Sequence, residues 1–485
     1  MLKNLFLPFT AISLMFLPNI CLSQAPDTLW ARRLNSRSNA TCCVVDNNGY
    51  FYVMGYSWNG ENNDFLTIKY NPVTGDTIWT KRYNGSPNGF DEAYGCAVDK
   101  NGYLYVTGEF YTGLDYDYLT IKYNASTGDI AWTKYYMNNG FDQARSCAVD
   151  DSGNLYITGC SFNGNNYDYL TIKYKTSSGD TVWSKRFNSP ENRNDYAYGC
   201  AVDTQGYVYV TGSSTDKDFY TIKYSPQTGD TVWMRSYQDQ SSQNDANCCV
   251  LDHMGNLYIT GRSFNDATLN FECLTVKYNP TTGDTIWSRR YSSLTNGNGC
   301  AVDIQGNLYV VGTVCDTSMK YAIVKYSPTG EILWSQRYNG INNSDDYAYC
   351  CAVDNDGSLY VAGNTYDVVP YILTVKYGTV NGVEERSNAG VAPQKFILFS
   401  NNPNPFLFQT TIKYQLSSQD LVSISLYNNL GEIVKTIVNK VQNPGLYQIT
   451  WDGRDHNGQS VSSGVYFYRL QVGRGSAIKK MILLK

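Results

Sequence analysis

The stretch Tyr118-Leu-Thr-Ile-Lys-Tyr123, the turn Ser126-Thr-Gly-Asp129 and Trp132 together form a unit that recurs seven times along the chain. Alternating aromatic and β-branched residues predict a strand, and the Thr-Gly-Asp turn is typical of a tight chain reversal. The period of roughly 50 residues is typical of solenoids and propellers. The tryptophans that mark the copies are Trp30, Trp79, Trp132, Trp183, Trp233, Trp287 and Trp334.

A complete copy contains four expected strands, which we name A to D. In the second copy, strand A covers residues 93–99, strand B residues 103–108 and strand C residues 118–123, and strand D carries Trp132. An Asp-x-x-Gly turn joins strands A and B in every copy. Four strands per copy and seven copies predict an all-β, seven-bladed β-propeller over residues 27–377.

The two ends of the repeat region argue against the alternative, an open solenoid. The region starts with a lone strand D at residues 27–34 and stops after a lone A-B-C set at residues 348–377. Together these pieces make one blade, so the N-terminal strand is expected to close the last blade. Closure removes the sheet edges that an open stack would expose.

Composition narrows the classes of function. The 485 residues include 43 tyrosines, only 17% are charged, and the net charge is -5. No basic stripe is visible, so we expect no nucleic-acid partner. The two histidines, His253 and His456, are too few for a His-rich metal site. Histidine is also the usual proton shuttle near neutral pH, so its scarcity disfavours acyl-transfer chemistry. We expect a monomer without a cofactor, with Ca²⁺ as the one ion that the sequence leaves open.

The N-terminus predicts a signal peptide over residues 1–23. Lys3 precedes an apolar run from Leu5 to Leu22, with cleavage near Ser23. The alternative, an uncleaved anchor, is disfavoured by Pro8, Pro18 and the lack of a basic stop-transfer flank. No other stretch is long and apolar enough to cross a bilayer, so we expect a secreted protein or one attached to the outer cell surface.

Thirteen cysteines remain after removal of the signal peptide, and seven of them occupy the same place in each copy. A residue repeated once per blade cannot easily meet its own copy, so packing is the favoured interpretation. These seven are Cys43, Cys96, Cys147, Cys200, Cys249, Cys300 and Cys351. One or two bridges could involve the others, whose pairing the sequence leaves open. They are Cys42, Cys160, Cys248, Cys273, Cys315 and Cys350.

Residues 378–392 form a polar linker, and residues 393–485 lack the repeat. About seven short strands in some 90 residues predict an immunoglobulin-like sandwich. The clearest alternation of apolar and polar side chains lies in residues 465–472.

Two groups of short sequence strings resemble known families. Gly153-Asn-Leu-Tyr-Ile-Thr-Gly159 and Gly179-Asp-Thr-Val-Trp183 resemble the bacterial seven-bladed propeller repeat, whose members share no common reaction. Asn402-Pro-Asn-Pro-Phe406 and Ser463-Gly-Val-Tyr466 resemble the type A C-terminal sorting domain of the type IX secretion system. They equally resemble the Ig-like domain of flagellar hook-capping proteins. The sorting resemblance implies export by the type IX secretion machinery; the alternative is an ordinary spacer domain.

The B–C and D–A connections vary in length between copies and emerge on one face of the predicted ring, which we call the variable face. Function commonly resides on variable loops held by a rigid scaffold. Aromatic rings and amides suit a glycan, peptide or protein ligand, although Asn and Gly also simply turn chains. The candidate binding rings are Trp58, Phe90, Tyr111, Phe141, Phe162, Phe264 and Tyr366.

Acidic residues recur on the same face, five positions before the repeated cysteine and at the start of strand C. Clustered carboxylates could bind Ca²⁺, but repetition in every blade favours a structural role as turn acceptors. The first set is Asp91, Asp142, Asp195 and Asp346, and the second is Asp64, Asp117, Asp168 and Asp218.

The sequence therefore favours a secreted or cell-surface binding protein. The alternatives are a carboxylate-dependent carbohydrate-active hydrolase or lyase, which needs two acids about 5–9 Å apart at the channel mouth, and a structural surface or adhesion component.

Overall fold

The structure is a computed structural model of the whole chain. It describes residues 25–378 apart from 87, 216–218, 238–242, 316–317, 339 and 341–343, and residues 396–484 apart from 400, 402, 405, 417, 429–431 and 474. The predicted signal peptide, Asp218 and almost all of the predicted linker lie outside the described residues. The chain divides into two compact units between residues 380 and 381. Among the described residues, no helix is long and apolar enough to cross a membrane.

The first unit consists of four-stranded antiparallel sheets, which are the predicted blades. Blade 1 contains β2 (Ser38–Val45), β3 (Phe51–Trp58), β4 (Asn63–Tyr70) and β5 (Thr77–Tyr83); blade 2 contains β6 (Glu92–Val98), β7 (Tyr103–Tyr111), β8 (Tyr116–Asn124) and β9 (Ile130–Tyr136). Blade 3 contains β10 (Asp142–Val149), β11 (Asn154–Phe162), β12 (Tyr167–Lys175) and β13 (Thr181–Phe187); blade 4 contains β14 (Asp195–Val202), β15 (Val208–Ser214), β16 (Phe219–Tyr224) and β17 (Thr231–Tyr237).

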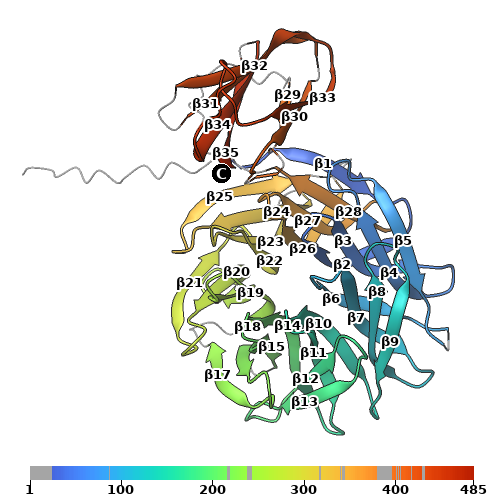
Figure 1. Cartoon of the computed structure of the whole chain (residues 1–485). Helices are drawn as coiled ribbons and strands as arrows, with labels where there is room; N and C mark the ends of the chain where they lie inside the picture. Colours follow the sequence, from blue (N-terminus) through green and yellow to red (C-terminus); the bar gives the residue numbers. More distant parts are fainter. Residues whose placement is uncertain are drawn as a thin grey trace, which may run out of the picture. The chain divides into compact units, whose positions relative to one another are not determined.

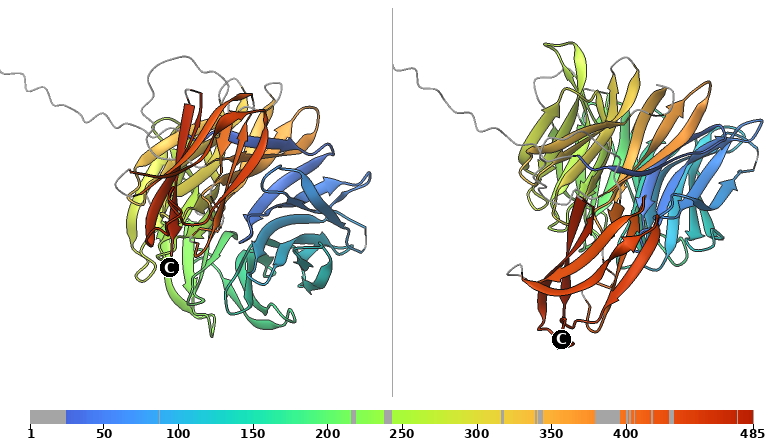
Figure 2. Two further views of the ribbon diagram at one scale, coloured as in Figure 1. Left: turned by 45° about the horizontal axis from the view of Figure 1, so that its top comes forward. Right: turned by 90° about the horizontal axis from the view of Figure 1, so that it is seen from above.

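The remaining three blades follow the same order. Blade 5 contains β18 (Asn244–Leu251), β19 (Leu257–Asn265), β20 (Asn270–Tyr278) and β21 (Thr285–Tyr291); blade 6 contains β22 (Asn296–Val302), β23 (Leu308–Cys315), β24 (Met319–Tyr326) and β25 (Ile332–Tyr338). Blade 7 contains β26 (Asp345–Val353), β27 (Leu359–Tyr366), β28 (Pro370–Tyr377) and β1 (Thr28–Arg33). The seven sheets stand around a common axis, with the A strands innermost (Figures 1 and 2).

The first and last strands of the propeller share a sheet. Strand β1 pairs antiparallel with β28, with Trp30 opposite Lys376 and Arg33 opposite Leu373. Figure 1 shows β1, in blue, beside the orange strands of blade 7. The ring is therefore closed by its own two ends, as the split repeat predicts. The all-β seven-bladed fold is confirmed.

In six C–D turns of the described structure, one backbone carbonyl receives two side-chain donors from the preceding blade. In blade 4, the Trp233 indole N–H and the Lys223 ammonium donate to the Pro280 carbonyl of blade 5, at 3.1 and 3.0 Å. We call this arrangement the Trp–Lys clamp. It recurs at six interfaces, where the accepting residue is Pro72, Ala125, Thr176, Pro226, Pro280 or Pro328.

The clamp onto blade 1 is a second contact that involves both the first and the last strand of the propeller. Trp30 from β1 and Lys376 from β28 both donate to the Pro72 carbonyl. Blade 7 has no continuous C–D turn, because its strands C and D, β28 and β1, come from opposite ends of the propeller. Six of the seven repeated lysines donate to such a C–D turn carbonyl, whereas Lys325 donates to the Tyr309 hydroxyl and lies 3.0 Å from Asp303. Burial lowers the pKa of Lys223, while Asp203 partly opposes that shift.

The Asp-x-x-Gly turns are held by their own aspartates. In the A–B turn of blade 2, Asp99 Oδ1 accepts from the backbone N–H groups of Asn101 and Tyr103, both at 2.9 Å. Its Oδ2 accepts from the Tyr105 hydroxyl at 2.9 Å, and Gly102 adopts a φ of 81°. The aspartate thus fixes both the turn and a buried tyrosine of strand B.

The second unit is a two-sheet sandwich. One sheet contains β29 (Phe396–Leu398), β30 (Thr410–Leu416) and β33 (Gly445–Trp451); the other contains β32 (Ile433–Gln442), β31 (Asp420–Tyr427), β34 (Gly464–Val472) and β35 (Gly475–Leu483). Trp451 is buried between the sheets, and its indole N–H donates to the Arg454 carbonyl at 2.8 Å. The fold agrees with the predicted Ig-like sandwich.

The clamp makes a prediction about stability. Replacing buried Trp233 with alanine removes packing between blades 4 and 5 and one clamp donor, so we expect the free energy of unfolding to fall by about 3–5 kcal/mol. The control Trp58→Ala, at a half-buried ring on the variable face, should cost about 1 kcal/mol or less. Urea denaturation measures both; equal losses would contradict a special role of the clamp tryptophan.

Candidate functional site

A β-bulge interrupts strand A of every blade at the same position. In blade 3, Ala144 pairs with Gly159 and Ser146 with Thr158, so Arg145 is the extra residue. Bulges redirect side chains, and here they turn one residue per blade toward the central channel. The seven bulge residues are Thr41, Tyr94, Arg145, Tyr198, Asn247, Asn298 and Tyr349.

A cavity of about 350 Å³ occupies the channel at this level. Six of the seven bulge residues line it, all except Asn298. Its wall is completed by Asn39, Ala40, Tyr56, Asn364 and Tyr366. Tyr366 is the last residue of β27 and is exposed, so the cavity reaches the variable face. The volume lies in the range of small-molecule sites.

The cationic group in this wall is Arg145. Its guanidinium carbon lies 4.3 Å from the Tyr94 ring centroid and 5.8 Å from that of Tyr198. The guanidinium is thus held between two aromatic rings, which attract it through their π faces. A stacked guanidinium directs its N–H donors in the plane between the rings, which suits recognition of planar or polar acceptors.

Two glutamates lie behind Tyr94 without lining the cavity. The Tyr94 hydroxyl donates to Glu92 at 2.6 Å and lies 3.2 Å from a Glu109 oxygen. Burial raises the pKa of Glu109 to about 7, with nearby Glu92 adding to the shift and Arg145 opposing it. Gln143 also donates a short hydrogen bond to Glu109.

The predicted binding rings fall into separate groups on the variable face. Tyr366 lines the cavity and packs edge-on against Tyr347. Trp58 packs against exposed Phe90, and Phe264 packs against Phe271.

Tyr111, Phe141 and Phe162 join a continuous series of half-buried rings. The series runs Tyr111, Tyr116, Phe141, Tyr167, Tyr196 and Tyr198, with neighbouring centroids 5.4–6.4 Å apart and Phe162 against Tyr167. It leads from the variable face to the cavity wall. A ligand role for all seven predicted rings stays a prediction.

The predicted acids hold the connections of the variable face. In blade 2, Asp91 accepts from the Gly85 N–H at 2.5 Å and the Tyr111 N–H at 3.1 Å, which ties the D–A connection to the end of strand B. Asp195 and Asp346 accept the same D–A bond from Ser189 and Gly340. These bonds agree with a structural role.

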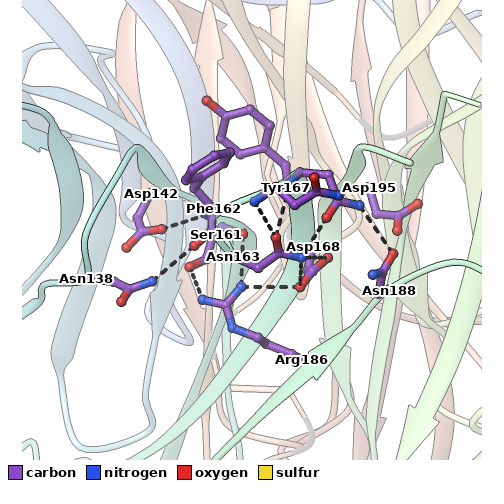
Figure 3. Close-up of polar contacts among 12 residues, drawn as sticks. Asn138, Asp142, Ser161, Phe162, Asn163, Tyr167, Asp168, Arg186, Asn188 and Asp195 are labelled. Atoms are coloured by element: carbon purple, nitrogen blue, oxygen red, sulfur yellow. Dashed lines mark hydrogen bonds and ion pairs between the residues drawn. The ribbon is translucent and has the colours of Figure 1, made fainter. Parts of the chain in front are cut away.

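Figure 3 shows the corresponding region between blades 3 and 4. Asp142 accepts from the Phe162 N–H at 3.0 Å, and both Asp168 oxygens accept from the Asn163 amide at 3.0 Å. Arg186 bonds the Ser161 carbonyl and approaches Asp168 at 3.4 Å. Within the described parts of the chain, no three His, Cys, Asp or Glu side chains group as metal ligands. A calcium ion at these acids stays a prediction.

Sequence reasoning missed the bulge residues as a set. Their signal was present: each lies two positions before the repeated cysteine, at a position that holds Thr, Tyr, Arg or Asn, whereas the residue before it is Ala or Gly in every copy. That strand looked structural because its neighbours are small and apolar. Only the bulge turns the variable position into the channel.

Comparison with known families identifies both units. The family model described as outer membrane protein assembly factor BamB matches residues 64–246 and 120–349, which together span more than half of the chain. The chain belongs to this BamB-type propeller family. The model of the FlgD Ig-like domain matches residues 408–476, so of the two C-terminal resemblances the hook-capping one is confirmed. No curated protein matches the chain in sequence.

Solved structures resemble this BamB-type propeller only distantly. The quinohemoprotein alcohol dehydrogenase ADHIIG from Pseudomonas putida HK5 is 12% identical, with 79% of each chain covered and a TM-score of 0.44. The Kuenenia stuttgartiensis hydrazine synthase is 11% identical over 72% of this chain and 98% of that one, with a TM-score of 0.48. The Dos1 propeller is 9% identical over 73% and 95%, with a TM-score of 0.46. TM-scores this low carry no argument about function.

Buried acids around the variable face predict how stability depends on pH. Burial raises the pKa of Asp91 to about 6 and the pKa values of Asp117 and Glu109 to about 7. Unfolded carboxyls titrate near pH 4, so between about pH 4 and 7 the folded chain binds more protons. The free energy of unfolding should therefore fall as pH rises through this window.

We expect a higher thermal midpoint at pH 5 than at pH 8, and a smaller difference in Asp117→Asn. The control Asp129→Asn should leave the difference unchanged, because Thr127 and Lys81 already lower the pKa of exposed Asp129 below this window. Scanning calorimetry at both pH values measures it. A midpoint that rises from pH 5 to pH 8 would show that the buried acids do not control the dependence.

Proposed function

We propose that this chain is an exported binding protein that holds its ligand in the channel mouth on the variable face. The observation that carries the proposal is the cavity itself, which is lined by bulge residues from six blades. A ring that places a different residue from each blade at one point builds a composite surface. Such a surface can be specific while the scaffold stays constant.

The wall chemistry favours a polar ligand with flat faces. Tyrosine rings can stack on a sugar or an aromatic side chain, and the amides of Asn39, Asn247 and Asn364 both donate and accept hydrogen bonds. Arg145 adds a donor for a hydroxyl, carbonyl or carboxylate. No carboxylate lines the cavity among the described residues, which separates this wall from a glycosidase site. A glycan is therefore the first ligand class to test, followed by a peptide or protein segment.

Three further features support an exported binding role. The family description names an assembly factor rather than an enzyme. The sequence of residues 1–23 resembles a signal peptide, and residues 393–485 resemble the type IX sorting domain. On this proposal the protein is a secreted or surface-attached monomer that the type IX machinery exports.

A second candidate function rests on Glu92 and Glu109. Both carboxylates lie within 3.2 Å of the Tyr94 hydroxyl, and Tyr94 lines the cavity. With its pKa raised to about 7, Glu109 could act as a general acid near neutral pH. A carbohydrate-active enzyme would need these groups to reach the ligand past the Tyr94 ring.

The binding proposal predicts loss of affinity on change of the wall. The full chain should bind members of a glycan or peptide array, and calorimetry should show at least about a tenfold weaker Kd for Arg145→Ala. The control Val73→Ala, at an exposed residue in the C–D turn of blade 1 and outside the cavity wall, should keep the affinity. No binding on either array, or equal affinities for both variants, would contradict the proposal. Turnover of a bound glycan that Glu109→Gln abolishes would favour the second candidate.

The export proposal predicts a change of location. In a bacterium with a type IX system, the full chain should reach the medium or cell surface, whereas a chain lacking residues 393–485 should stay in the periplasm. Immunoblots of the cell fractions measure this. Equal export of both chains would show that the C-terminal unit is not the sorting signal.

A further inference from the structure

Three blades carry a second cysteine directly before the repeated one. These are Cys42 in blade 1, Cys248 in blade 5 and Cys350 in blade 7. Blades 2, 4 and 6 have glycine there, and blade 3 has Ser146. Each extra cysteine lies just after the β-bulge of its inner strand, where neighbouring A strands come close together.

Each extra thiol contacts the repeated thiol of the next blade. The Sγ atoms of Cys248 and Cys300 are 3.3 Å apart. Cys42 lies next to Cys96, and Cys350 next to Cys43, close enough for the two thiols of each pair to interact. The two thiols of every pair also belong to one hydrophobic cluster between blades. The repeated cysteine therefore meets the extra cysteine of the preceding blade rather than its own copy.

The glycines at this position show how closely the inner strands of adjacent blades approach each other. A Cβ added to Gly299 of blade 6 would lie 2.8 Å from the Cys350 Cα of blade 7, and one added to Gly95 of blade 2 would lie 2.7 Å from the Ser146 Cα of blade 3. Inner strands of adjacent blades thus approach to the range that disulfide geometry needs. Closing the bond between Cys248 and Cys300 requires their sulfurs to move together by about 1.3 Å.

We propose that Cys42–Cys96, Cys248–Cys300 and Cys43–Cys350 are disulfide sites that staple adjacent blades when the protein meets a disulfide oxidant such as oxidised glutathione. One thiolate attacks the oxidant, a mixed disulfide forms and one glutathione thiolate leaves. The second protein thiol loses its proton and attacks the mixed disulfide, which expels the second glutathione. Each pair gives up two electrons and two protons, and the oxidant becomes two thiols.

The Cys43–Cys350 staple has a particular consequence. It joins blade 1 to blade 7, the blade that also contains the N-terminal strand, and it closes a loop of about 300 residues. Cross-links that close long loops restrict the unfolded chain most. Oxidation therefore fastens the ring where its hydrogen-bonded closure joins the two ends of the chain.

Native full-length protein incubated with millimolar oxidised glutathione at pH 8 tests the proposal through non-reducing peptide mapping. We expect the three named cross-links, each lowering the mass by about 2 Da through loss of two hydrogens. Cys248→Ser should lose its own link alone. Ser146→Cys should gain a fourth link from position 146 to Cys200 of blade 4. The oxidised protein should show a thermal midpoint higher by about 5 °C or more than the reduced protein.

Exposed Cys315 is the internal control, because its mixed disulfide with glutathione reports that the oxidant is active. Refolding from urea in a glutathione redox buffer gives every thiol access to the oxidant. Modified Cys315 with the three pairs unlinked after both treatments would overturn the proposal. Links between other cysteines in place of the named pairs would also overturn it.

Discussion

The structure depends on one repeated interaction, in which a tryptophan and a lysine of one blade donate to a single carbonyl of the next. Two donors on one acceptor fix both the distance and the rotation between neighbouring sheets. At Thr176 and Pro226 the accepting residue is buried, so without the clamp its carbonyl would be an unsatisfied acceptor, which is costly. Because the repeat supplies the same tryptophan and lysine in successive blades, the same contact between neighbouring blades recurs around the ring. The clamp from Trp30 and Lys376 onto Pro72 extends this rule across the two chain ends.

In a rigid ring, one variable position per blade is enough to set the composition of the cavity wall. Strand A is constant in its small apolar residues, which pack the inner strands together, while the bulge sends one residue per blade into the channel. Evolution can then alter the wall of the cavity without disturbing the interfaces. The sandwich of Arg145 between Tyr94 and Tyr198 is one outcome, because its three side chains come from consecutive blades.

The fold was readable from the sequence because its signals are local and repeated. The Thr-Gly-Asp turn and the Asp99 turn each act within a few residues, Trp132 has a counterpart in every copy, and the split blade follows from counting strands. The site was less readable. The sequence placed rings such as Tyr366 on the correct face, but a bulge is set by backbone pairing, so the variable position of strand A could not be assigned to the channel from the sequence. The lysine acceptors are not predictable from the sequence for a related reason, since any residue type can supply a backbone carbonyl.

The central claim is that the propeller is one closed ring, held shut by β1. Amide hydrogen exchange tests it most directly, by comparing β1 (Thr28–Arg33) with β13 (Thr181–Phe187), an outer strand whose blade is continuous in sequence. The account predicts that both strands exchange equally slowly, because each opens only when the ring unfolds. Rapid exchange of β1 while β13 stays protected would contradict it.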